Sequence, residues 1–337
     1  MKKNKRTLII AEIGVNHNGR LSIAKKLIKK AAEAKVDVVK FQIFNADNLV
    51  TPYAKKAKYQ QKKNNFKQTQ LAMLKKLQFN NREFLKLTKL CKKLKIEFCA
   101  SFFDTESLPL FKKLGIKRIK IPSGEITNFI MLKKIAKLKK KIIMSTGMSS
   151  INEIKDAIKV LTTFGSKLKD ITLLHCNSEY PSPYKDVNLL AMEQIKKKFN
   201  TDVGYSDHTT GIEVSIAAVA MGASVIEKHL TLNKNLKGPD HKASIEPNEL
   251  KHLVCSVRNI EVALGKSKKI ITKSEKKNRV AARKSIMAST EVLKGEKFSL
   301  KNLNAKRPGH GMSPMLMPKI IGKRAKKKFK VNEIIRL

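Results

Sequence analysis

Two histidines, His208 and His229, lie in segments that otherwise read as buried β-strands. His208 ends the run DVGYSDH, and His229 lies in SVIEKHL, where Glu227 precedes it by two residues. Side chains two residues apart on a strand face the same side, so Glu227 and His229 are expected to point together. Burying unpaired charge is costly, which favours a site over plain packing. Imidazoles on neighbouring strands suit Mn, Fe, Co or Zn, and Glu227 is predicted as ligand, base or orienting carboxylate.

A second set of polar residues offers positive charge and hydroxyl donors at the ends of other predicted strands. Its members are Lys40, Lys120, Ser101, Ser123 and Ser206. A phosphate or phosphoenol group requires ammonium and hydroxyl donors that lie close together in one site. Each residue alone could be a satisfied polar group of the core. Their recurrence at the ends of successive strands favours an anion-binding site.

The elements that must position these residues are eight short β-rich runs separated by amphipathic helical patterns. The runs are 8–15, 38–44, 97–103, 118–124, 141–147, 171–177, 202–208 and 224–230. This alternation predicts an α/β fold, a (β/α)8 TIM barrel whose active site forms at the carboxyl ends of the strands. A doubly wound open sheet is the alternative, but no G-x-G-x-x-G motif follows the first run.

The chain is predicted to carry a second, smaller unit after the barrel. We expect the barrel over 1–267, a Lys/Ser-rich linker over 268–282 and a small β-rich module over 283–337. The Pro and Gly residues of KRPGHGMSP indicate turns in that module.

The formal net charge of +45 is compatible with a nucleic-acid-binding protein. The excess is mostly Lys spread along helical segments, however, and aromatics are sparse, which favours a solvated surface that steers anionic substrates. No apolar run is long enough to span a bilayer, and the four cysteines form no C-x-x-C pair. We therefore expect a cytoplasmic protein without membrane contact.

With these residues in hand, the chain resembles the sialic acid synthase family, the phosphoenolpyruvate-dependent synthases of nonulosonic acids. The matching stretches, in order, are AEIGVNHNG, VKFQ, IPSGEITN, STGM, LHCNSEYPSPYKDVNL, GYSDHTTGIE, IEKHLTL, GPDHKASIEP and KRPGHGMSP. The resemblance implies a TIM barrel followed by a C-terminal antifreeze-like (SAF, β-clip) domain. It also implies a homodimer in which the swapped SAF domain caps the partner's barrel.

The resemblance further implies condensation of phosphoenolpyruvate with an N-acylated mannosamine-type sugar, releasing phosphate by C–O cleavage. The cofactor would be a divalent metal, usually Mn²⁺, with Mg²⁺ or Co²⁺ as alternatives. By this likeness the metal ligands are His208 and His229, and the catalytic carboxylates are Glu12, Glu125 and Glu227. Phosphoenolpyruvate would contact Lys40, Ser101, Lys120, Ser123, Asn177 or Ser178, and Ser206, and the sugar would contact Gln42, Tyr180, Asp240 and the partner's Arg307.

Several alternatives remain open within and outside the family. N-acetylneuraminate synthase is placed first, with legionaminic acid synthase, acting on 2,4-diacetamido-2,4,6-trideoxymannose, as the alternative. A Schiff-base aldolase using Lys40 or Lys120 is a rival of another class. The chain also departs from the family pattern in having SFF at 101–103 for T-P-F, and His310 in RPGHG for RPGNG.

Overall fold

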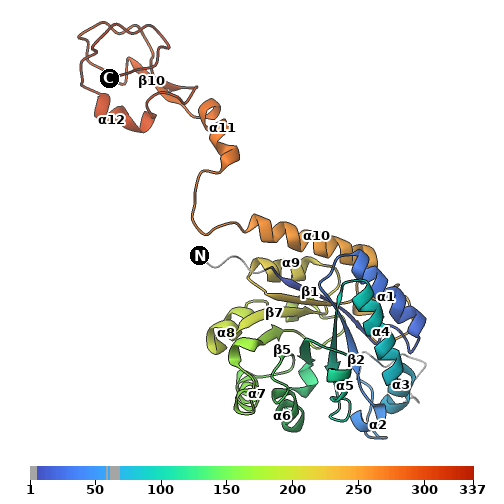
Figure 1. Cartoon of the computed structure of the whole chain (residues 1–337). Helices are drawn as coiled ribbons and strands as arrows, with labels where there is room; N and C mark the ends of the chain where they lie inside the picture. Colours follow the sequence, from blue (N-terminus) through green and yellow to red (C-terminus); the bar gives the residue numbers. More distant parts are fainter. Residues whose placement is uncertain (1–5, 58–59, 61–68) are drawn as a thin grey trace. The chain divides into compact units, whose positions relative to one another are not determined.

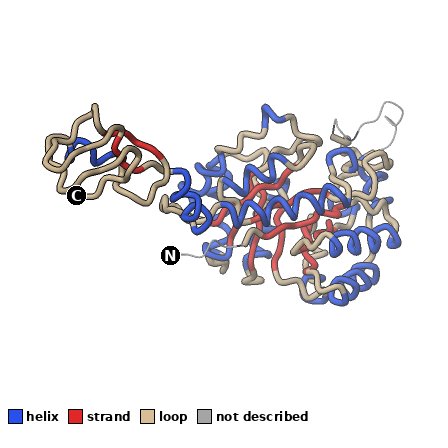
Figure 2. Tube along the Cα trace, turned by 90° about the horizontal axis from the view of Figure 1, so that it is seen from above, coloured by secondary structure: helices blue, strands red, loops and turns tan. Residues whose placement is uncertain are grey.

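The computed structural model describes residues 6–57, 60 and 69–337, which divide into two compact units, Met1–Gly265 and Lys266–Leu337. The larger unit is a closed barrel of eight parallel strands in the order β1 to β8, with helices around it (Figures 1 and 2). Strand β8 pairs with β1 and closes the barrel. This confirms the predicted (β/α)8 architecture.

The barrel strands are β1 Leu8–Gly14, β2 Val38–Ile43, β3 Glu97–Phe102, β4 Arg118–Ile121, β5 Lys141–Ser145, β6 Ile171–His175, β7 Asp202–Asp207 and β8 Val225–His229. The helices of this unit are α1 Leu21–Glu33, α2 Ala46–Leu49, α3 Gln70–Leu77, α4 Asn81–Lys93, α5 Leu110–Lys113, α6 Phe129–Ala136, α7 Ile151–Thr163, α8 Ala191–Phe199, α9 Glu213–Ala220 and α10 Pro247–Ala263.

The helices cover the barrel because their apolar residues repeat at helical spacing. In α1, Ala24, Leu27, Ile28 and Ala31 are buried while the lysines between them are exposed. Helices α4 and α7 begin with capping boxes, in which Asn80 pairs with Glu83 and Ser150 with Glu153.

The barrel interior is built in two layers, and this layering creates the site. The lower layer is an apolar cluster of Ile10, Val38, Cys99, Ile143, Leu174 and Val225. Two residues further along five of these six segments, the side chains are polar: Glu12, Lys40, Ser101, Ser145 and Glu227. Because alternate residues of a strand share a face, these polar groups lie directly above the apolar layer.

The high positive charge lies mainly on the surface of the described part of the chain. There, Lys40, Lys56, Lys120 and Lys228 are the lysines that are buried. Three of these four belong to barrel strands β2, β4 and β8. Among the residues described, no helix has the length and apolar character needed to cross a bilayer.

The smaller unit consists mostly of loops, with one small sheet and short helices, as Figure 2 shows. It contains α11 Lys273–Ala282, β9 Ser285–Ala288, β10 Leu303–Lys306 and α12 Met317–Ile320. Strands β9 and β10 are antiparallel, and the core includes Ile286, Phe298 and Phe329. The predicted linker over 268–282 therefore holds a helix, α11, which begins with a capping box between Thr272 and Glu275. The small antiparallel sheet is consistent with the SAF domain expected after the barrel.

Candidate active site

A cavity of about 460 Å³ lies at the carboxyl ends of the barrel strands. It brings together fourteen of the sixteen residues predicted to form the site. These are Glu12, Lys40, Gln42, Ser101, Lys120, Ser123, Glu125, Ser178, Tyr180, Ser206, His208, Glu227, His229 and Asp240. They come from seven strands or the loops that follow them, which is the placement expected of a barrel active site.

Two lysines flank one carboxylate on the floor of the cavity. The Nζ atom of Lys40 lies 3.7 Å from Oε2 of Glu227, and the Nζ atom of Lys120 lies 3.4 Å from its Oε1. Lys40 also pairs with Glu12, at 2.9 Å. Ser206 donates to Glu227 at 3.0 Å. The floor therefore concentrates ammonium and hydroxyl donors around a single carboxylate.

The protonation states of these groups follow from burial and charge. Burial alone would raise the pKa of Glu227, but Lys120 and Lys40 outweigh it and lower the pKa to about 2. For Glu12, burial dominates over the nearby Lys40 and raises the pKa. Burial would lower the pKa of Lys40, but Glu12 and Glu227 raise it. Glu227 is thus an anion and Lys40 a cation near neutral pH.

The two histidines stand side by side as neutral imidazoles. Their ring centroids are 5.5 Å apart. Burial lowers the pKa of His208 to about 4 and that of His229 well below its usual value. His208 Nδ1 lies 2.5 Å from the carbonyl oxygen of Asn177, and its Nε2 lies 3.1 Å from the hydroxyl of Tyr180. An Nδ1–H bonded to a carbonyl leaves the Nε2 lone pair directed into the cavity.

The donor set fits a divalent metal that keeps open positions. His229 Nδ1 is buried without a hydrogen-bond partner and lies 4.0 Å from Oδ2 of Asp240. A buried imidazole nitrogen without a partner is explained by a ligand that the protein itself does not supply. Among the described residues there is no cluster of three or more His, Cys, Asp or Glu ligands. Two imidazoles would therefore hold the ion, and water or substrate oxygens would complete its coordination.

Tyr180, Asp240 and Glu125 line the same cavity from the loops. Tyr180 stacks on His208 with centroids 4.1 Å apart. Burial, with a smaller contribution from Glu12, raises the pKa of Asp240 to about 7. Burial also raises the pKa of Glu125, which accepts a 2.6 Å hydrogen bond from Asn128. Carboxyl groups with raised pKa values in a cleft are suited to proton transfer.

Two predicted residues are not brought into this cavity. The side chain of Asn177 accepts from Glu179 N at 2.8 Å and donates to the Asp186 carbonyl at 3.2 Å, shaping the loop after β6. Of the pair Asn177 and Ser178, the structure thus brings Ser178 to the cavity. Arg307 belongs to the smaller unit, where its Nε donates to the carbonyl of Ala282 at 2.9 Å.

The cavity also has features that were not among the predicted site residues. Ser145 accepts a 2.7 Å hydrogen bond from Lys120. Its position as the last residue of β5 is the sequence feature that could have identified it as a site residue. One wall is apolar and comes from α2, α3 and the ends of neighbouring strands. Its members are Leu49, Val50, Met73, Leu74, Leu77 and Phe103. Elements as short as α2 and α3 carry too little periodicity to predict such a wall.

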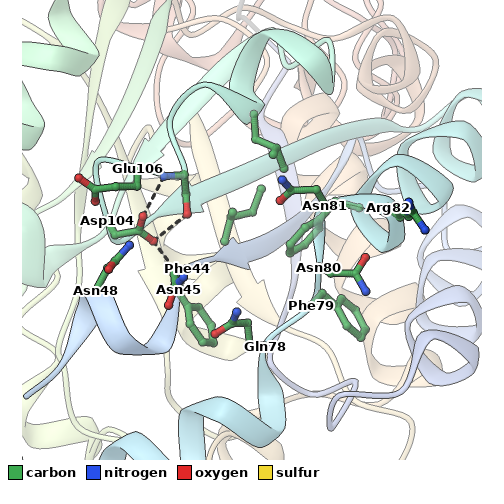
Figure 3. A pocket seen from close by; sticks show the side chains of 14 residues that line it. Phe44, Asn45, Asn48, Gln78, Phe79, Asn80, Asn81, Arg82, Asp104 and Glu106 are labelled. Atoms are coloured by element: carbon green, nitrogen blue, oxygen red, sulfur yellow. Dashed lines mark hydrogen bonds between the residues drawn. The ribbon is translucent and has the colours of Figure 1, made fainter. Parts of the chain in front are cut away.

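A second cavity, of about 600 Å³, is lined by many polar residues, and some of them form hydrogen bonds with neighbouring loops (Figure 3). Asp104 accepts hydrogen bonds from Asn45 N and from the N and Oγ of Ser107, at 2.7–2.8 Å. Asn80 caps α4. Asp104 and Asn80 thus hold the local backbone of the segments around this cavity.

Comparison with known proteins places the chain in a family. The NeuB family profile matches residues 27–269. The chain is 53% identical over 332 residues, 98% of its length and 99% of the relative's, to the N,N′-diacetyllegionaminic acid synthase of Campylobacter jejuni subsp. jejuni serotype O:2. It is 45% identical to the synthase of the same name from Legionella pneumophila, over 94% of this chain and 89% of that protein.

A solved structure agrees with both the fold and the family. It is that of N-acetylneuraminic acid (sialic acid) synthetase from Leptospira borgpetersenii serovar Hardjo-bovis in complex with citrate. The match has a TM-score of 0.71 and 36% identity, covering 82% of this chain and 90% of the other. The chain therefore belongs to the NeuB family, the sialic acid synthases whose motifs its sequence carries, and is a condensing transferase of that family.

Proposed function

We propose that this protein is an N,N′-diacetyllegionaminic acid synthase. It would condense phosphoenolpyruvate with 2,4-diacetamido-2,4,6-trideoxymannose and release phosphate. N-acetylneuraminate synthase was the first expectation from the sequence. The relatives favour the alternative, because two synthases named for N,N′-diacetyllegionaminic acid are 53% and 45% identical, whereas the N-acetylneuraminic acid synthetase of known structure is 36% identical.

The observation that carries the chemistry is the placement of Lys40 and Lys120 on either side of Glu227. Phosphoenolpyruvate carries a phosphate and a carboxylate, and each needs charge-assisted donors in a partly desolvated site. The buried ammonium groups of the two lysines supply these donors, together with the hydroxyls of Ser101 and Ser206. Ser123 and Ser178 line the same cavity and extend this set.

The sugar would occupy the side of the cavity that carries His208, His229 and Asp240. A divalent metal, for which Mn²⁺ is our proposal, would supply Lewis-acid polarisation of the sugar aldehyde there. His208 and His229 would hold it through neutral imidazole nitrogens. Asp240 and Tyr180 would orient the sugar hydroxyl or amide groups. Glu12 and Glu125, whose pKa values are raised, are the proposed proton carriers.

A Schiff-base aldolase is less compatible with the same residues. Such an enzyme needs a lysine that is a free amine near neutral pH. The raised pKa of Lys40, held by Glu12 and Glu227, keeps it as an ammonium ion. Borohydride trapping in the presence of a carbonyl substrate is therefore expected to leave no covalent adduct on Lys40.

The test is phosphate release from phosphoenolpyruvate by the full chain with Mn²⁺, comparing 2,4-diacetamido-2,4,6-trideoxymannose with N-acetylmannosamine. A higher kcat/KM with the first sugar supports the proposal. A higher value with N-acetylmannosamine would return the assignment to N-acetylneuraminate synthase. No release with either sugar, from folded protein shown to bind Mn²⁺, would reject phosphoenolpyruvate condensation for both.

A further inference from the structure

We propose that a buried ion pair on the outer face of the barrel, Asp207 with Lys228, positions the two histidines of the site. The inference rests on the metal site proposed above. The Nζ atom of Lys228 lies 2.9 Å from Oδ2 of Asp207, and both side chains are fully buried. Asp207 immediately precedes His208, and Lys228 immediately precedes His229. The pair thus sits one residue from each proposed metal ligand.

Strand register places this pair opposite the site. Residues Ser206 and Glu227 are partners across β7 and β8, and Asp207 and Lys228 are the next partners. Because successive side chains alternate between faces, Ser206 and Glu227 point into the cavity while the ion pair points toward the helix layer. The pair therefore locks β7 to β8 at the level where the histidines emerge.

Asp207 also shapes the backbone around His208. Its Oδ1 accepts from the N and Oγ1 of Thr209, at 2.9 and 2.7 Å, so a closed turn surrounds the histidine. Its Oδ2 accepts from Ser215 of α9 at 2.6 Å. Lys228 in turn donates to the carbonyl of Thr209 at 2.6 Å. One network thus joins both strands, the loop after β7 and helix α9.

His229 depends on this network because its ring has few other anchors. Its Nδ1 has no hydrogen-bond partner, and its ring contacts Tyr180 and His208. Its carbonyl accepts from Ile245 N at 2.8 Å. The position of the ring is therefore set by the β8 backbone, which the ion pair ties to β7.

The pair stands where packing alone would favour apolar residues. On the same outer face, Val203 and Tyr205 precede Asp207, and Ile226 precedes Lys228, all within the main apolar cluster. A buried ion pair contributes little net stability, and an apolar pair of similar size is often as stable. What the pair adds is a fixed geometry, which a metal site needs to within about 0.5 Å.

The test removes the charges of Asp207 and Lys228 together. An effect on the placement of the two histidines can then be distinguished from an effect on the stability of the fold. The variant combines Asp207→Asn with Lys228→Met, so that no unpaired charge is left buried. Its matched control combines Glu97→Gln with Arg118→Met. That pair also joins two neighbouring strands, at 2.6 Å, but at the amino ends of β3 and β4. Mn²⁺ affinity of the full chain is measured by titration calorimetry without substrates, and stability by urea unfolding.

We expect the Asp207/Lys228 double variant to bind Mn²⁺ about tenfold more weakly, a loss typical of groups that orient ligands. The control should bind Mn²⁺ as the parent protein does. On metal-free protein with labelled histidines, the nuclear Overhauser effect between the two imidazole rings should weaken only in the Asp207/Lys228 variant. An unchanged dissociation constant together with an unchanged ring contact would overturn the inference.

Two further outcomes remain decisive. If the parent protein binds no Mn²⁺, the metal site is rejected, and the ring contact alone decides whether the pair positions the histidines. If the double variant does not fold, Ser215→Ala takes its place, because it removes a single hydrogen bond to Asp207. Its control is Ser224→Ala, which loses a 2.8 Å bond to the Val203 carbonyl at the amino ends of the same strands. Equal Mn²⁺ affinity in these two variants would overturn the inference.

Discussion

The Nδ1 atom of His208 lies 2.5 Å from the backbone carbonyl oxygen of Asn177. This contact fixes the tautomer of the imidazole, since a carbonyl can only accept, and so Nδ1 must carry the proton. The lone pair on Nε2 is then directed into the cavity beside His229. A hydrogen bond to the backbone of the loop after β6 therefore leaves His208, in the loop after β7, with the lone pair that the proposed metal ligand requires.

Replacing either histidine is expected to remove metal-dependent turnover. Without one of the two proposed imidazole ligands, the ion would be held by the other alone, so phosphate release with Mn²⁺ should fall about a hundredfold or more in His208→Ala and His229→Ala. Urea unfolding should show that both variants remain folded. The exposed His252 supplies the control variant His252→Ala. Turnover close to that of the control in either histidine variant would exclude the metal site.

Lys120 is expected to govern binding of phosphoenolpyruvate. It is the group that contributes most to lowering the pKa of Glu227, and it donates to Ser145. In Lys120→Met the anion site loses one of its two flanking ammonium groups, so KM for phosphoenolpyruvate should rise about tenfold or more. KM for the sugar should change less. Lys155→Met, at an exposed position of α7, is the matched control, and equal KM values in the two variants would argue against this role.

His17 is expected to make the protein less stable in mild acid. Its ring stacks on Phe79 with centroids 3.9 Å apart, and its Nδ1 accepts from Gly19 N. Burial lowers its pKa to about 3, against 6.5 for the ordinary side chain. Between these values the unfolded chain binds more protons, so the free energy of unfolding falls as the pH drops from 6.5 toward 3. At pH 5 the loss should be about 2 kcal/mol.

The measurement for His17 is the difference between urea unfolding of the parent protein and of His17→Gln at pH 7 and pH 5. Glutamine is uncharged at both values, so the parent should lose more stability than the variant on acidification. The other buried histidines contribute equally to both chains and cancel. His252→Gln should follow the parent protein. Parallel losses in the parent and in His17→Gln would mean that His17 binds protons equally in the folded and unfolded chains, so that burial does not lower its pKa.

The barrel and the composition of its site could be predicted because strand periodicity puts alternate residues on one face. The predicted runs nevertheless extend past the strands at their carboxyl ends. The run 118–124 is an example: β4 ends at Ile121 because Pro122 follows, and Ser123–Glu125 form a single 3₁₀ turn. Residues such as Ser123 and Glu125 therefore reach the cavity from loops.

Other features depended on contacts that no local pattern contains. Alternation indicates that Lys228 faces away from the site, but its partners, Asp207 and the carbonyl of Thr209, come from β7 and the loop that follows it. Helix α11 was missed because its apolar residues are few, although the T-x-x-E signal at Thr272 and Glu275 marks its start.

Arg307 is proposed to act in the active site of a partner subunit, and this can be tested by complementation. If the smaller unit of one chain completes the barrel site of another, a dimer of an Arg307→Ala chain and a His229→Ala chain contains one intact site. Co-expression of the two, each inactive alone, should then restore about a quarter of the parent activity when the subunits assort at random. The control pairs His208→Ala with His229→Ala, which leaves no intact barrel in any dimer. Recovery only in the first pair supports action in trans, whereas no recovery in dimers shown to be mixed would place Arg307 in its own chain's site or outside any site.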